Sequence, residues 1–168
     1  MSKVSTLFEL QKLDLEIEAK EKELSQVMEK LGDDTILQEQ RAALEVTKTR
    51  AAELEKRRQS LDWEAADLQA KIAPHEKKLY SGQIRVPKEL LALQQDVEML
   101  KGHRRGLEDA ELEIMLELDE TNRQVRETSK ELEEQERNWK EEQKRLSAAK
   151  ATLSGEIAVL QGQREAQA

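Results

Sequence analysis

The side chains that could carry chemistry in this sequence are two histidines, many carboxylates and two nearby glycines. His75 and His103 each stand alone, and the chain has no cysteine, so neither has the neighbouring ligands that a zinc site requires. Gly102 and Gly106 flank a basic triplet inside a helical pattern, which is not the glycine-rich loop of a phosphate site. We therefore expect no metal site and no cofactor site in this chain, and we expect both histidines to be polar surface residues.

Carboxylates act as acids or bases when a dry pocket shifts their pKa values, and this composition is unsuited to building one. Charged residues make up 38% of the 168 residues, whereas aromatic residues make up 2%. A chain so poor in aromatic and β-branched residues cannot pack a sheet or a thick core. The sequence therefore predicts a protein that is not an enzyme. The remaining choices are a disordered polyampholyte and long helices.

Heptad spacing in the second half of the chain favours helices over disorder. Nine of eleven positions spaced by seven are apolar, and this strict period predicts a left-handed coiled-coil seam. The seam positions are Leu90, Val97, Arg104, Glu111, Leu118, Val125, Leu132, Trp139, Leu146, Leu153 and Leu160. A companion stripe comprises Leu93, Leu100, Leu107 and Ile114, then polar Thr121, Thr128, Gln135 and Glu142, and finally Ala149.

The first half carries two further heptad registers, separated by a phase break at Gly32-Asp33-Asp34 that disfavours helix. We expect a kink or short interruption there rather than a domain boundary. The first register comprises Leu10, Leu13, Ile17, Lys20, Leu24, Val27 and Leu31. The second comprises Leu37, Gln40, Leu44, Thr47, Ala51, Leu54, Arg58, Leu61, Ala65, Leu68 and Ile72.

Residues that typically end or begin helices are concentrated between positions 74 and 87. Pro74 cannot continue a straight helix but can begin a fresh turn, Gly82 suits a left-handed C-terminal cap, and Pro87 suits the first position of a new helix. Val86 is a poor N-cap because it has no side-chain oxygen. The predicted fold is all-α, a long antiparallel two-helix coiled-coil hairpin that is softer or bent near the middle. Arm one spans about residues 5–79, the tip 74–87 and arm two 87–161. The alternative is a parallel dimer of long helices with an incidental loop.

The hairpin predicts which residues of the two arms face each other. Residues 121–142, where the companion stripe turns polar, should face residues 25–46, which contain the phase break. Both arms would then be weak at the same level. Arg58 and Glu111 are polar seam residues at matching levels, so we expect them to pair and to set the register.

Charge is distributed unevenly along this chain, whose net charge is −8. Residues 74–88 contain four basic residues and one acidic residue, a net of +3, which leaves −11 for the rest. Residues 107–143 contain 14 acidic and 5 basic residues, a net of −9. A basic tip on an acidic shaft suggests a contact point for a partner. The alternative is that coiled-coil flanks are simply charged.

The tip is our candidate partner-binding site. Tyr80 and Ile84 would anchor the partner, and the lysines would steer it. Alternatively, Leu79, Gly82 and Pro87 merely close the turn. The candidate residues are Lys78, Leu79, Tyr80, Ser81, Gly82, Ile84, Pro87 and Lys88.

Other contact modes follow from the same pattern. Trp63 falls on an outward position, where it either marks an interface, as in a homodimer of hairpins, or is tucked in by a local register shift. Nucleic-acid binding should be weak, because a +3 tip offers few phosphate contacts and the acidic shaft repels the backbone. A purely structural spacer is a third reading. The sequence has neither a signal peptide nor an apolar run long enough for a membrane span, so we expect a cytoplasmic protein without membrane contact.

Two segments resemble a bacterial family. LYSGQIRVPKELLALQQDVEMLK (residues 79–101) and GLEDAELEIMLELDE (106–120) are similar to the signature of the coiled-coil, C4-type zinc-ribbon family, also called domain of unknown function 164. The opening LFELQKLDLEIEAKEKEL (7–24) resembles the start of that family. The resemblance covers essentially the whole chain. Val86 departs from it, because an Asn-like cap is usual there.

The resemblance implies a helical hairpin followed by a ribbon that holds zinc through two cysteine pairs. Zinc is therefore expected only if such a ribbon follows residue 168. The resemblance also implies an adaptor or chaperone for the sigma-54 transcription factor or for flagellar and type III secretion components. It offers nucleic-acid binding as an alternative, mainly through the ribbon.

Overall fold

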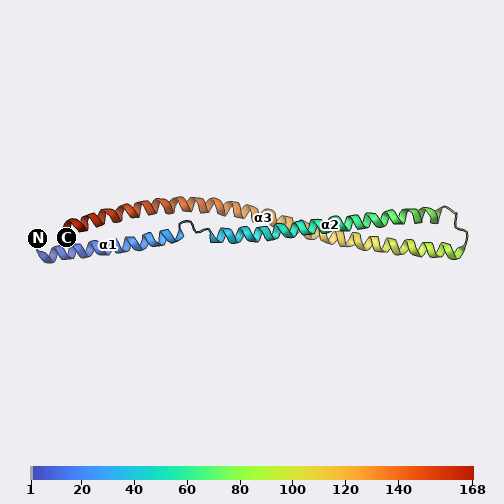
Figure 1. Ribbon diagram of the computed structural model, residues 1–168, viewed down its shortest axis with the longest axis horizontal. Helices are drawn as coiled ribbons and strands as arrows, with labels where there is room; N and C mark the ends of the chain where they lie inside the picture. The colour runs from blue at the N-terminus through green and yellow to red at the C-terminus, as the bar shows by residue number, and fades with distance from the viewer. Residues whose placement is uncertain (1) are drawn as a thin grey trace. The chain divides into compact units, whose positions relative to one another are not determined.

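The computed structural model describes residues 2–168, which form three helices and no strand. Helix α1 spans Lys3–Lys30, α2 spans Thr35–Tyr80 and α3 spans Pro87–Gln167 (Figure 1). Helices α1 and α2 together form the first arm of the predicted hairpin, and α3 forms the second. The all-α coiled-coil hairpin is confirmed. The chain divides into two compact units, Met1–Arg41 with Glu131–Ala168 (unit 1) and Ala42–Lys130 (unit 2).

Unit 2 contains the connection between α2 and α3, and its core follows the predicted seams. Ile72 is fully buried, and Leu54, Leu61 and Val97 are each 2% exposed. Each such side chain contributes about 1.5–3 kcal/mol through burial. Because the two helices of one chain supply this core to each other, the alternative of a parallel dimer with an incidental loop is wrong.

Unit 1 pairs α1 and the first turns of α2 with the C-terminal part of α3. Its buried residues include Ile17 and Leu37 from the first arm and Leu146 and Leu153 from the second, all at predicted seam positions. The ammonium of Lys20, the polar seam position, bonds the Glu156 carboxylate at 2.5 Å. This bond raises the pKa of Lys20. Its stem lies along the seam while its charge is paired across it.

The companion stripe of α3 differs between the two units. In unit 2, the predicted positions from Leu93 to Ile114 are half-buried and Thr121 is buried. In unit 1, predicted Gln135 is exposed, predicted Glu142 and Ala149 are half-buried, and the residue after each of the three is half-buried as well. An α-helix drifts about 20° per heptad, so about five heptads change the inward position by one residue. The later stripe comprises Glu136, Gln143, Lys150 and Ile157.

Pro74 lies inside α2, which continues without a break to Tyr80. The expectation that Pro74 cannot continue a straight helix is therefore wrong, and the interruption begins only after Tyr80. Proline removes one backbone donor and crowds the preceding turn. Here the cost falls on an exposed side of the helix, while fully buried Ile72 and half-buried Leu79 hold both flanking turns to α3. No helix in residues 2–168 is both long and apolar enough to cross a bilayer.

Candidate functional site

The loop between α2 and α3 is closed by contacts within the loop itself. Gly82 has a φ of 74°, the left-handed conformation predicted for a helix C-terminus. The Ser81 hydroxyl donates to the Lys78 carbonyl at 2.8 Å and accepts from the Gln83 amide at 3.3 Å. The predicted role of Gly82 as a cap is thus confirmed.

Helix α3 begins at Pro87, as the sequence predicted. The Val86 carbonyl accepts from the Leu90 amide at 3.0 Å, so the helix starts with Val86 as its N-cap. The Val86 side chain has no oxygen to cap a further amide. Glu89 lies in the first turn, where its negative charge suits the helix dipole.

The eight candidate tip residues lie together at the loop end of unit 2. Tyr80 is 79% exposed, and Leu79 and Ile84 are half-buried. The other five are exposed: Lys78, Ser81, Gly82, Pro87 and Lys88. Gly82 and Pro87 shape the turn and the helix start, so the turn-closing role is present for both. Partner contact by any of the eight stays a prediction.

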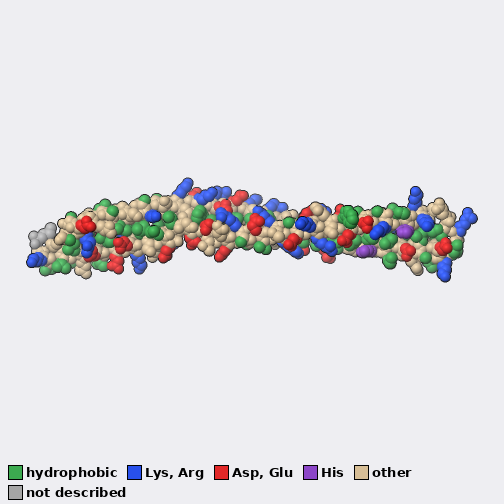
Figure 2. Space-filling view, in the orientation of Figure 1, with side chains coloured by type: hydrophobic (Ala, Val, Ile, Leu, Met, Phe, Trp, Pro, Cys, Tyr) green, Lys and Arg blue, Asp and Glu red, His purple; other side chains and the backbone are tan. Residues whose placement is uncertain are grey.

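An open groove of about 630 Å³ lies beside this loop. Lys78 forms part of its wall, and Ile84 is one of its apolar residues. Figure 2 shows Lys and Arg side chains projecting at this end of unit 2, which is the right-hand end of the view. Seven groove residues were not among the predicted tip residues, and the four from α3 follow helical spacing, by which they could have been recognised. The seven are Gln83, Arg85, Val86, Glu89, Ala92, Leu93 and Asp96.

The predicted contact between Arg58 and Glu111 is present but shared. Arg58 Nη1 lies 3.4 Å from a Glu111 oxygen, while Nε and Nη2 bond Glu55 at 3.1 and 2.8 Å. The Glu55 contact is the larger cause of the raised pKa of Arg58. Glu55 lies on the same helix as Arg58, so that contact carries no information on the pairing of the arms. Register setting by Arg58 and Glu111 stays a prediction.

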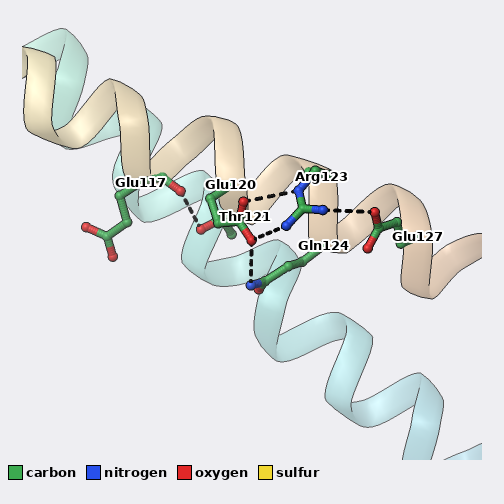
Figure 3. A network of polar contacts seen from close by, with 6 residues as sticks. All are labelled: Glu117, Glu120, Thr121, Arg123, Gln124 and Glu127. Carbon is green, nitrogen blue, oxygen red and sulfur yellow. Dashed lines mark hydrogen bonds and ion pairs between the residues drawn. The ribbon is translucent and has the colours of Figure 1, made fainter.

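A polar network on α3 also stays within one helix (Figure 3). Arg123 lies between Glu120 and Glu127, donating to the first at 2.6 Å and to the second at 3.2 Å. These bonds raise the pKa of Arg123 and lower that of Glu120. Thr121 is buried, and its hydroxyl donates to the Glu117 carbonyl at 2.8 Å. The pairs formed by Arg123 stabilise α3 on its exposed side. The buried Thr121 hydroxyl has its hydrogen-bond partner within the same helix.

The predicted interruption lies between Lys30 and Thr35, and two residues of α3 contact it directly. The Gln143 side chain accepts from the Gly32 amide at 2.7 Å and donates to the Lys30 carbonyl at 3.3 Å. The Trp139 indole donates to the Asp33 carbonyl at 2.8 Å. These bonds satisfy backbone groups that the two helix ends leave free. We call Trp139 and Gln143 the clasp.

The clasp confirms that this part of α3 faces the phase break, as the hairpin predicted within unit 1. Arg41 and Glu136 are a further pair at this level, joined by a bond of 3.0 Å. Gln40 Oε1 is buried and has no hydrogen-bond partner within residues 2–168. The pairing of the two arms is therefore weakened by the unpaired oxygen of Gln40. At the break it is stronger than the polar companion stripe predicted.

Trp63 is 73% exposed on the outer side of α2. The register shift that would tuck it in is therefore wrong, and an interface role stays a prediction. Of the two histidines, His75 is half-buried and His103 exposed. Within the described chain, no three His, Asp or Glu side chains are grouped so that they could hold a metal ion.

Comparison with known proteins gave one match. The model of a protein family, described as CT398-like coiled coil hairpin domain, matches residues 10–168. Neither the curated proteins nor the solved structures yielded a match. The family match agrees with the hairpin part of the predicted resemblance, and a zinc ribbon stays a prediction.

Proposed function

Since the chain belongs to the family of CT398-like coiled coil hairpin domains, we propose that it is a non-enzymatic adaptor or chaperone whose tip binds a protein partner. Coiled-coil hairpins have few places to form a catalytic pocket but expose long surfaces and a loop end. The resemblance described above points to two partner classes, the sigma-54 factor and flagellar or type III secretion components.

The exposure of Tyr80 is the observation that carries this proposal. An aromatic ring that is 79% exposed at the last residue of α2 contributes little to the core of unit 2. Aromatic residues beside basic ones are frequent anchors of protein interfaces, because they bury a large area at low entropic cost. Lys78 and Lys88, both exposed, would steer an acidic partner toward the ring.

A direct binding assay tests the proposal. Purified sigma-54 factor and a purified type III secretion component are titrated against the chain and against the double variant Tyr80→Ala, Lys78→Ala. The matched control is Trp63→Ala, Lys56→Ala, which also removes one exposed aromatic residue and one exposed lysine from α2. We expect the tip variant to weaken binding about tenfold or more, and the control to stay near the original affinity. Circular dichroism verifies that both variants remain helical.

Each other outcome contradicts the proposal in a different way. Equal binding by the tip variant and the original chain would remove the tip from the interface. Loss of binding in the Trp63 variant alone would transfer the interface to the outer side of α2. If neither variant changes binding, the interface lies elsewhere on the chain, and if neither protein binds, the chain is better described as a structural spacer. Salt-dependent micromolar binding of RNA or DNA would favour the nucleic-acid alternative.

A further inference from the structure

The groove beside the tip loop is lined by apolar residues and by the basic residues Lys78 and Arg85, and we propose that it binds an acidic protein segment that carries an apolar anchor. This inference rests on the proposed function, because the groove is part of the same tip. It adds the chemistry of the partner, which the exposure of Tyr80 alone does not specify.

Four of the residues that line the groove are apolar. Ile84 and Val86 come from the loop, and Ala92 and Leu93 come from the second turn of α3. Ile84 and Leu93 are half-buried, and Val86 is 49% exposed, so each still presents apolar surface. Covering this surface with a leucine- or phenylalanine-sized side chain would contribute about 1.5–3 kcal/mol. The groove therefore suits an apolar anchor.

The basic residues of the tip lack acidic partners. Glu76 is the one acidic residue between positions 74 and 88, and its carboxylate is paired with Lys101 of α3. The salt bridges of residues 2–168 include none of the four cations of this stretch. Lys78 and Arg85 line the groove directly. The four cations are Lys77, Lys78, Arg85 and Lys88.

These four cations form no salt bridge within residues 2–168, and they are complementary to a partner carboxylate at the loop side of the groove. It contrasts with the paired cations of the shaft, such as Arg50 with Glu117 at 2.7 Å. A carboxylate beside the apolar anchor would lie against Lys78 and Arg85 while the anchor covers Ile84 and Leu93.

Two acidic residues in the lining of the groove make a protein segment a better occupant than a nucleic acid. Glu89 and Asp96 of α3 line the groove, and their carboxylates would repel a chain of phosphates. A peptide carries a carboxylate on one side and neutral or basic groups on the other. It can therefore match both the basic and the acidic residues of the groove, which a uniformly charged backbone cannot.

Fluorescence anisotropy with short labelled probes tests the inference on the whole chain. The first probe is a peptide that alternates acidic residues with Leu and Phe. In the second, Lys replaces each acid, and in the third, Ser replaces each apolar residue. The fourth probe is a single-stranded RNA. We expect the first probe to bind about tenfold more tightly than the other three at low salt.

Variants then locate the contact. We expect Arg85→Glu to weaken binding of the first peptide about tenfold and Ile84→Ser by a similar factor, while Glu89→Lys strengthens it. Lys56→Glu is the matched control, because it reverses an exposed charge of α2 far along the helix from the loop, and it should leave the affinity nearly unchanged. Circular dichroism verifies that each variant is folded.

The inference is overturned if the basic or the serine peptide binds as well as the first, or if Arg85→Glu and Lys56→Glu behave alike. Preference for the RNA would make the tip a phosphate site instead. These results are separable from failure of the proposed function. The tip can still bind sigma-54 or a secretion component in the Tyr80-dependent assay when acidic peptides do not bind. Loss of Tyr80 dependence, by contrast, contradicts the proposed function itself.

Discussion

The two interruptions of helix in this chain share a glycine conformation but differ in the side chains that bind their backbone. Each contains a glycine in the left-handed conformation, Gly32 with φ 79° and Gly82 with φ 74°. At the break between α1 and α2, Trp139 and Gln143 of α3 bind the freed backbone groups. At the tip loop, the side-chain bonds come from Ser81, a residue of the loop itself.

The difference follows from what lies opposite each interruption. The break lies against α3, whose side chains bind backbone amides and carbonyls that the two helix ends leave free. The tip loop faces solvent, where water satisfies the backbone and the side chains stay free. We infer that the break is built for stability and the tip for contact, and the following predictions test this contrast.

Trp139→Ala should have the largest effect. It removes the bond to the Asp33 carbonyl and the packing of a half-buried indole, and should lower the free energy of unfolding by about 2–3 kcal/mol. Tyr80→Ala, at the tip, should change it by less than about 0.5 kcal/mol. Urea denaturation followed by circular dichroism measures both. Equal losses from the two aromatic residues would abolish the contrast.

Gln143→Ala should have the next largest effect. The variant loses two hydrogen bonds to the break, which should cost about 1–2 kcal/mol. Gln135→Ala is the matched control, because Gln135 is an exposed glutamine of the same helix, and it should be nearly neutral. If both glutamines behave alike in denaturation, Gln143 does not hold the break.

Alanine at the two left-handed glycines compares the interruptions directly. A Cβ at either position meets no atom within 4 Å, so the cost is one of backbone conformation alone. We expect Gly32→Ala to cost about 1–2 kcal/mol, because the clasp holds its conformation, and Gly82→Ala about 1 kcal/mol or less. Thermal melts provide the comparison. As a control, Gly155→Ala in the interior of α3 should instead be stabilising.

Acid sensitivity should give the smallest effect and involve the break. The Asp33 carboxylate accepts bonds from the Thr35 hydroxyl at 2.6 Å and from the Thr35 amide at 3.2 Å, which lowers its pKa. A lowered folded-state pKa adds stability above the unfolded value of about 4 and loses it as the pH falls through the folded value.

Asp33→Asn should therefore destabilise the chain at neutral pH and differ less from the original at about pH 2. Melting temperatures at the two pH values measure the change. A difference between the two proteins that is the same at both pH values would show that Asp33 does not contribute through its charge.

Much of the fold was predictable because it depends on local and periodic features. Heptad spacing identified the buried positions of both arms, including Ile72 and Leu118. Gly82 and Pro87 marked the loop ends correctly, since their conformational preferences act within a single turn. Pro74 was wrong as an interruption, because packing on both sides of it outweighed its local cost. The tip was recognisable as a basic segment, although the groove needed the loop to bring Arg85 near Leu93.

The sequence by itself determined the class of fold, the seams, the sites of interruption and the uneven charge. The tertiary structure alone decided how the interruptions differ, because Gly32 and Gln143 are 111 residues apart in the chain. It also decided the one-residue change in the inward stripe of α3 and the sharing of Arg58 between Glu55 and Glu111. Such features depend on which side chains contact each other across the paired helices. Those contacts are set by distance in space and not by spacing along the chain.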